Sequence, residues 1–211
     1  MAENITLAFD TCLNKMYLAL TKDGELLSSK VVENHDEKYH SAFLISSIKE
    51  ILKENGLTPK DIGLIATNIG PGSFTGIRAC TTVARVMAQQ LGCRAIGISS
   101  LEILSKLAED NSAVVLDARK NKAYLYLDGE IKGAVEIEEV KELIKGKNII
   151  TDDALLPTFG GKTYQSFNVN LGEILVKLAN ERAITDACDW KKLKPLYIQP
   201  PPMGGRSFLG N

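Results

Sequence analysis

A glycine-rich segment between two apolar stretches constrains the fold of this chain more than any other feature. It covers residues 68–78 and reads Asn-Ile-Gly-Pro-Gly-Ser-Phe-Thr-Gly-Ile-Arg, after a short apolar run and before a long stretch with helical periodicity. Gly70 and Gly72 allow backbone angles that other residues resist, and Pro71 between them restricts one dihedral angle. The segment therefore predicts a tight turn from a strand into a helix.

The same turn has the features of a helix N-terminus. Ser73 belongs to the residue types that cap helices, so we expect it to cap a helix that begins at Phe74. Backbone N–H groups that point out of such a helix end can hold an anion. No Gly-Lys-Ser/Thr sequence ends the turn, so it is not a phosphate-binding P-loop. A purely structural turn and an anion site are the two alternatives.

The helix expected after the turn carries small residues along one face. Gly76, Cys80, Ala84 and Ala88 recur at intervals of four, which places them in one row on the helix surface. Larger apolar residues on the other faces indicate a helix that is buried on more than one side. The row of small residues would let a second backbone approach closely. That backbone could belong to this chain or to a partner, and the pattern does not decide between them.

The composition is that of an ordinary globular protein. The 211 residues are 45% hydrophobic and 24% charged with a net charge of −1, which suits one compact domain or two small lobes. A protein that holds nucleic acid by itself usually shows a basic face, whereas only Lys191, Lys192 and Lys194 cluster here. The four cysteines lie far apart in the sequence, with no C-x-x-C pair and no zinc-type spacing. Neither a signal peptide nor a membrane-length apolar run is recognised, which predicts a cytoplasmic protein without membrane contact.

The order of expected elements occurs twice along the chain. Asp23-Gly24 and Asp128-Gly129 are hairpin signals at matching places in the two copies. We expect a first lobe at 1–104, a shortened second lobe at 105–199 and a Pro/Gly-rich tail at 200–211 without regular structure. The expected elements are strands at 5–9, 16–20, 26–32, 62–69 and 94–98 with helices at 36–54 and 74–91, then strands at 113–117, 123–127, 131 and 148–151 with helices at 138–145 and 172–182.

This order predicts an α/β protein with the actin-like ATPase fold of actin, Hsp70 and the sugar kinases. Each lobe would follow a βββαβαβ plan, and the second would be abbreviated.

Several segments resemble the TsaB (YeaZ) family, the dimerisation subunit of the bacterial machinery that installs threonylcarbamoyl on the adenosine next to the tRNA anticodon. The resemblance runs from about residue 5 to residue 127 and returns weakly near the C-terminus. The glycine turn with its long helix is the most specific of the matching features. The segments that carry it are Leu7-Ala-Phe-Asp-Thr11, His40-Ser41, residues 68–78, Gly97-Ile-Ser-Ser-Leu-Glu102, Asp117-Ala-Arg119 and Lys194-Pro-Leu-Tyr-Ile198.

The resemblance implies a non-catalytic scaffold. Its helices at 36–54 and 74–91 would pack against the equivalent helices of a TsaD/Kae1-type catalytic subunit, which would bind ATP and the metal, and a TsaE-type ATPase would join the assembled pair. The isolated chain would carry no cofactor, would meet tRNA only through the complex, and could form a homodimer when alone. The residues expected at the partner interface are Phe43, Ser47, Gly76, Ile77, Cys80, Thr81 and Ala84.

Two acids end the first strands of the two lobes, where this fold class usually meets phosphate and metal. Asp10 is followed by Thr11, and Asp117 is followed after one residue by Arg119. The two acids could hold Mg²⁺ on a nucleotide. Alternatively, each acid caps a turn by accepting hydrogen bonds from backbone N–H groups. The alternative function is therefore an ATP- and Mg²⁺-dependent phosphotransferase or hydrolase. The acids in the segment 151–154 argue against it, because they would repel phosphate.

No metal or peptidase centre is expected. The catalytic relatives carry H-x-x-x-H after the glycine-turn helix, and the matching place here reads Ser100-Leu-Glu-Ile-Leu104, in which Glu102 would be a surface or helix-end charge. The only histidines, His35 and His40, have a poor spacing for one helix face. Ser73 lies outside any G-x-S-x-G sequence. The sequence therefore predicts no catalytic residue.

Overall fold

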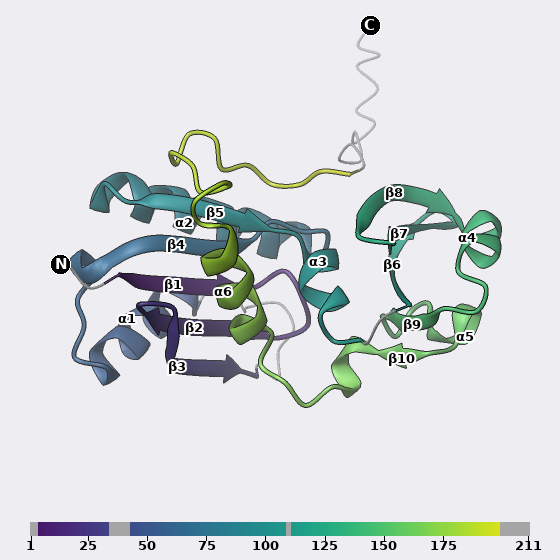
Figure 1. Ribbon diagram of the computed structural model, residues 1–211, viewed down its shortest axis with the longest axis horizontal. Coiled ribbons are helices and arrows are strands. Elements are labelled where there is room, and N and C mark those ends of the chain that lie inside the picture. The colour runs from purple at the N-terminus through teal and green to yellow at the C-terminus, as the bar shows by residue number, and fades with distance from the viewer. Residues whose placement is uncertain (1–3, 34–42, 109–110, 199–211) are drawn as a thin grey trace, which may run out of the picture.

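A computed structural model of the chain describes residues 4–33, 43–108 and 111–198. They form two lobes, each built on one sheet, and helix α3 lies where the lobes meet (Figure 1). One apolar core is shared between the lobes. It contains residues of the first sheet, of α3 and α6, and of the second sheet. The lobes are therefore joined by packed side chains as well as by the chain itself.

The first lobe contains a five-stranded sheet in the order β3-β2-β1-β4-β5. The first three strands are antiparallel, whereas β4 and β5 run parallel to β1. Asp23 and Gly24 both have positive φ between β2 and β3, as a tight hairpin turn requires. The strands are β1 (Ile5–Asp10), β2 (Met16–Lys22), β3 (Glu25–Val32), β4 (Ile62–Asn68) and β5 (Arg94–Ile98).

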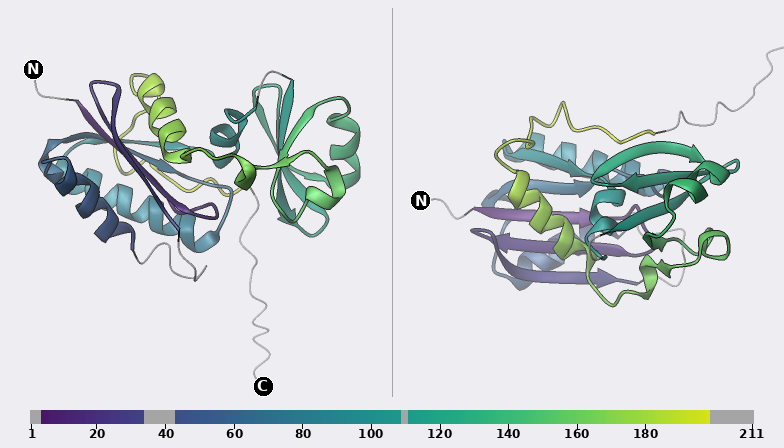
Figure 2. Two further views of the ribbon diagram at one scale, coloured as in Figure 1. Left: turned by 90° about the horizontal axis from the view of Figure 1, so that it is seen from below. Right: turned by 45° about the vertical axis from the view of Figure 1, so that its right-hand side comes forward.

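Helices cover both faces of this first sheet. Figure 2 shows α1 (Leu44–Glu54) and α2 (Phe74–Leu91) on one face and α6 (Leu171–Arg182) on the other. Side chains of a strand point to alternate faces. Accordingly Leu7 and Phe9 of β1 join the core under α1 and α2, while Ala8 joins the core with α6. Every residue of β1 is buried for this reason.

The second lobe repeats the topology with shorter elements. Its sheet has the order β10-β9-β6-β7-β8, with β6, β7 and β8 antiparallel and β9 and β10 parallel to β6. The elements are β6 (Ser112–Arg119), β7 (Lys122–Leu127), β8 (Glu130–Glu136), α4 (Ile137–Leu143), β9 (Asn148–Thr151), α5 (Leu156–Phe159) and β10 (Lys162–Thr163). This order confirms the predicted actin-like α/β fold and its abbreviated second copy.

Some elements differ from the sequence-based expectation. The short α3 (Ser100–Ser105), the strand β10, and two 3₁₀ turns at Pro59–Asp61 and Tyr164–Ser166 were not expected. Helix α6 was expected within the second lobe, but it packs across the first sheet. Residues 34–42, with the expected start of the first helix and both histidines, lie outside the described part of the chain. So does the tail 200–211. Over the described ranges, no helix is both long and apolar enough to cross a membrane.

Candidate functional site

The glycine turn joins β4 to α2 and packs against the loop that follows β1. Ser73 caps α2 as predicted, because its hydroxyl accepts a hydrogen bond from the Gly76 N–H at 3.3 Å. The Ser73 N–H in turn donates to the Cys12 carbonyl at 2.8 Å. A β-carbon at Gly72 would lie only 2.4 Å from that same carbonyl oxygen. The turn therefore needs glycine at this place because two loop backbones touch there.

Asp10 lies at the centre of this packed junction and is fully buried. One carboxylate oxygen accepts the Cys12 N–H at 2.6 Å, and the other accepts the Asn68 side-chain amide at 2.9 Å. Burial raises the pKa of the Asp10 carboxyl above its ordinary value, although these hydrogen bonds act in the opposite direction. Asn68 also accepts hydrogen bonds from the Gly70 N–H and the Ser100 hydroxyl. The acid thus holds together the ends of β1 and β4.

Thr11 is buried beside Asp10. Its hydroxyl donates to the Gly76 carbonyl at 3.0 Å, and its N–H donates to the Cys80 sulfur at 3.1 Å. Ligand atoms of Asp10, Cys12 and Cys80 lie within 4.8 Å of one another, which is close enough for a shared metal ion. However, each of these three side chains already makes hydrogen bonds with its neighbours. The cluster reads as a packed polar network between β1, β4 and α2.

Asp117 holds the corresponding position in the second lobe. Its carboxylate accepts the Arg119 N–H at 2.7 Å, the same two-residue relation that joins Asp10 to the Cys12 N–H. The Asp117 N–H donates to the Asp152 carboxylate at 2.7 Å. Asp117 and Arg119 are exposed, in contrast to Asp10. The turn-capping role that the sequence left open is therefore present at both acids.

A polar pocket of about 180 Å³ lies between the first lobe and the segment that leads into α6. Tyr164 lines this pocket. The pKa of the Tyr164 hydroxyl is raised by burial and by the negative charges of Asp152, Asp10 and Asp153. These acids make the surroundings unfavourable for a phosphate group. The pocket is lined by Asn14, Lys15, Tyr17, Val31, Glu33, Tyr164, Gln165, Phe167, Asn168, Val169, Asn170 and Leu171.

The row of small residues on α2 is part of this chain's own core. A β-carbon at Gly76 would lie 1.9 Å from the Thr11 carbonyl oxygen, so the close approach that the row permits is occupied by the loop after β1. Ala84 has 0% of its surface exposed. The expectation that this row meets a partner was therefore wrong. Of the seven residues expected at the interface, those buried by the chain itself are Ser47, Gly76, Ile77, Cys80, Thr81 and Ala84.

Exposed apolar side chains lie instead at the outside of the two helices. Phe43, which precedes α1, and Ile45 in α1 are about half-exposed, and Val86 of α2 is 52% exposed. Both helices lie on the same side of the sheet in Figure 2. Phe43 was expected at the interface, whereas Ile45 and Val86 were missed. Helical periodicity alone could have shown that Val86 and Ala84 lie on opposite faces of α2, because an interval of two residues corresponds to about 200° around the helix. We call Phe43, Ile45 and Val86 the outer face of α1 and α2.

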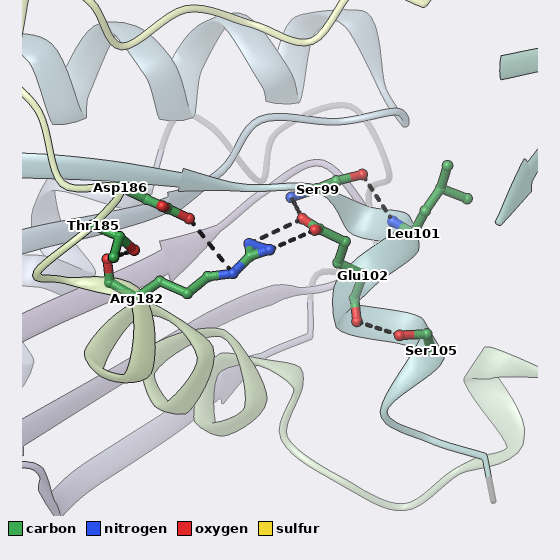
Figure 3. Close-up of polar contacts among 7 residues, drawn as sticks. All are labelled: Ser99, Leu101, Glu102, Ser105, Arg182, Thr185 and Asp186. Carbon is green, nitrogen blue, oxygen red and sulfur yellow. Dashed lines mark hydrogen bonds and ion pairs between the residues drawn. The ribbon is translucent and has the colours of Figure 1, made fainter. Parts of the chain in front are cut away.

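Glu102 has two structural roles, of which only the helix-end role was expected from the sequence. It forms a capping box at the start of α3, where its carboxylate accepts the Ser99 N–H at 3.2 Å (Figure 3). The same carboxylate pairs with the guanidinium of Arg182 in α6 at 2.7 Å. Arg182 also contacts Asp186 at 3.6 Å. Glu102 is thus a helix-end charge, as expected, and also ties α3 to α6.

Comparisons with known proteins match this chain to a TsaD family model and to proteins named TsaB. A model of the family TsaD, described as tRNA N6-adenosine threonylcarbamoyltransferase, matches residues 27–166. The "tRNA threonylcarbamoyladenosine biosynthesis protein TsaB" of Buchnera aphidicola (Schizaphis graminum) is 29% identical over 90% of this chain and 81% of its own length. The protein with the same name from Bacillus subtilis is 26% identical, over 71% of this chain and 63% of its own length.

Solved structures show the same fold. "YeaZ from Pseudomonas aeruginosa" superimposes with a TM-score of 0.70 at 20% identity, covering 92% of this chain and 99% of that one. A second structure from that organism, an uncharacterised protein with similarity to peptidase YeaZ, has a TM-score of 0.73 at 21% identity. It covers 93% of this chain and 100% of its own.

Proposed function

Because this chain belongs to the TsaB (YeaZ) family and matches the TsaD family model over most of its length, we propose that it acts in the biosynthesis of tRNA threonylcarbamoyladenosine. It is a non-catalytic subunit that binds a TsaD/Kae1-type catalytic subunit through the outer face of α1 and α2. ATP and metal belong to that partner, and a TsaE-type ATPase joins the assembled pair. The proposed role in tRNA modification implies a cytoplasmic location.

The exposed outer face is the observation that carries the proposal. Phe43, Ile45 and Val86 present large apolar side chains from two neighbouring helices, although the chain buries the inner faces of both helices well. Large apolar side chains that stay exposed beside polar neighbours can contribute to a protein–protein interface. Thr82 is exposed on α2, and Lys49 and Glu50 are exposed on α1, so they supply such polar neighbours. Without the catalytic partner, the same face would join two copies of this chain.

The polar network of the glycine turn supports a non-catalytic role. An actin-like ATPase reaction would require the acid at the end of β1 to face a metal-bound nucleotide. Asp10 is instead buried, and both of its oxygens accept hydrogen bonds from within the chain. The sequence Ser100–Leu104 lacks the two histidines of the catalytic relatives, and α3 uses Glu102 for capping. These contacts argue against the alternative of an ATP-dependent phosphotransferase or hydrolase.

Two substitutions on opposite sides of α2 test the proposal. Val86→Arg places a charge on the outer face, so it should abolish co-purification with the catalytic partner while leaving the thermal transition near the wild-type value. Ala84→Arg places the same side chain in the core. It should lower the thermal transition strongly, because a buried charge without a partner is severely destabilising. Glu181→Arg on the exposed surface of α6 is the control, since it introduces the same arginine far from the outer face.

Two results would overturn the proposal. One is a complex that survives Val86→Arg combined with Phe43→Arg in a chain that remains folded. The other is turnover of ATP by the purified chain alone that is lost in Asp10→Ala.

A further inference from the structure

The segment after α6 lies along the flank of α2 and the edge of the first sheet. Cys188 pairs with Ala95 of β5 as an isolated antiparallel bridge, and the Leu196 N–H donates to the Ile69 carbonyl at 2.9 Å. Figure 1 shows this segment running over β5 and α2 at the upper edge of the first lobe. It therefore brings residues from the end of the described chain beside residues of α2 that are about 110 positions earlier.

Five cations gather where the segment and α2 meet. Arg78 and Arg85 are seven residues apart, so they lie on one side of α2. Lys191, Lys192 and Lys194 come from the segment and are exposed. Within the ranges that the structure describes, none of these five side chains forms an ion pair. One acid, Asp189, lies among them, and its carboxylate accepts the Lys191 N–H. The sequence showed only the three lysines, and the structure adds the two arginines.

Aromatic rings lie between these cations. The Arg85 guanidinium is 5.6 Å from the centre of the Trp190 ring, and the Lys191 ammonium is 5.5 Å from it. The Arg78 guanidinium is 5.2 Å from the centre of the Phe74 ring, which lies 6.2 Å from the ring of Tyr197. Phe74 and Tyr197 are 49% and 48% exposed. We call this set the basic–aromatic strip, namely Phe74, Arg78, Arg85, Trp190, Lys191, Lys192, Lys194 and Tyr197.

The contacts between the segment and α2 define the direction and the length of the strip. Trp190 lies beside Arg85, and Tyr197 lies beside Phe74, so the segment runs antiparallel to α2 over three turns of the helix. The eleven helical steps from residue 74 to residue 85 span about 16 Å at a helical rise of about 1.5 Å per residue. Phosphates along one strand of duplex DNA are about 3.4 Å apart along the axis, and the spacing is larger in an extended single strand. The strip is therefore long enough to contact more than one nucleotide.

We propose that the basic–aromatic strip binds single-stranded RNA. The lysines and arginines contact phosphates, and bases stack on the exposed rings of Phe74 and Tyr197 and on the arginine planes. An acidic protein segment would satisfy the cations but would leave the half-exposed rings without stacking partners. The proposal rests on the function proposed above, because it makes this subunit a direct contact for the tRNA rather than a scaffold that meets it only through the complex.

Trp190 provides the probe, because it is the only tryptophan of the chain. Its fluorescence is titrated in the full-length protein with a uridine-only RNA oligomer and with an unmodified tRNA transcript. We expect saturable quenching that weakens with salt, with a slope of about −0.7 per phosphate contact in a plot of log K against log salt. Replacing Lys191, Lys192 and Lys194 together by alanine should weaken binding and flatten this slope.

Tyr197→Ala separates stacking from charge. It should weaken binding about tenfold and leave the salt slope unchanged, because stacking on an aromatic ring does not release counterions. The matched control replaces three lysines of the second lobe by alanine, and it should leave binding unchanged. Those lysines are Lys141, Lys145 and Lys147, each of which is paired with an acid. All variants are first checked for an unchanged thermal transition.

Two results would overturn this inference. One is the absence of quenching by either RNA at low salt. The other is equal quenching by polyglutamate with the same loss in Tyr197→Ala, which would identify an acidic protein partner. Co-purification distinguishes this failure from that of the proposed function. The triple lysine variant should still bind the catalytic subunit, so loss of RNA binding alone leaves the proposed function standing.

Discussion

The backbone of α2 at Gly76 touches the carbonyl oxygen of Thr11, where a β-carbon would lie at 1.9 Å. The nearest obstacle is a backbone atom, which cannot move away as a flexible side chain can. Gly76→Ala should therefore destabilise the fold by about 1–3 kcal/mol, the usual range for overpacking. Urea unfolding measures the change, and Thr82→Ala on the exposed side of α2 is the control. Helix propensity alone would make Gly76→Ala more stable than the wild type, and that outcome would refute the contact.

Glu102 contacts both α3 and α6, so different substitutions of Glu102 should lower the free energy of unfolding by different amounts. Glu102→Ala removes the capping contact and the ion pair, and a loss of about 1–2 kcal/mol in the free energy of unfolding is expected. Glu102→Gln keeps a side chain that suits a capping box and should cost less. Because Glu102 and Arg182 are 23% and 35% exposed, the pair itself should contribute at most about 1 kcal/mol.

A double-mutant cycle of Glu102→Gln and Arg182→Ala measures this coupling between α3 and α6. The coupling energy should shrink as salt is raised, because salt screens partly exposed charges. A coupling near zero at low salt would show that Arg182 only packs beside Glu102.

Asp10 should make stability depend on pH. Burial raises the pKa of its carboxyl above the ordinary value of 3.8, so the folded protein holds the proton more tightly than the unfolded chain. The contribution of Asp10 to stability is therefore greatest at low pH and decreases as the pH rises from about 4 towards the folded pKa. Cys12, Tyr17 and Tyr164 are the titratable groups that interact with this carboxyl.

Asp10→Asn provides the comparison. The amide offers one acceptor where the carboxylate offers two, so either the Cys12 N–H or the Asn68 amide loses its partner at a cost of about 1–3 kcal/mol. The stability difference between wild type and variant should become smaller as the pH rises from about 4 to about 8. Unfolding curves over that range measure it, and a difference that grows with pH would contradict the assigned direction.

The four thiols should react in a definite order. All are free, but Cys12 and Cys80 are fully buried, whereas Cys93 and Cys188 are only partly buried. Burial raises the pKa of the Cys12 thiol, which keeps it in the unreactive protonated form. Brief treatment with iodoacetamide should therefore label Cys93 and Cys188 first, as mass spectrometry of peptides can show. Equal labelling of Cys12 in the folded protein would contradict the packed junction.

The turns and the helix cap were predictable from the sequence because they depend on local backbone chemistry. The Asp23-Gly24 and Asp128-Gly129 turns adopt positive φ because aspartate and glycine tolerate it, and this depends on few neighbours. Ser73 caps α2 for an equally local reason. Repetition of such signals along the chain was enough to predict the two lobes and their topology.

The identity of the contacting surfaces depended on tertiary packing. The spacing of Gly76, Cys80 and Ala84 determined that one face of α2 could be approached closely, but it held no information on which backbone would do so. The loop after β1 occupies that place, since β1 and β4 are neighbours in the sheet. In the same way, the pairing of Glu102 with Arg182 and the gathering of cations around Trp190 join residues far apart in sequence. Periodicity describes a single element, whereas contacts between elements follow from how the whole chain closes around its core.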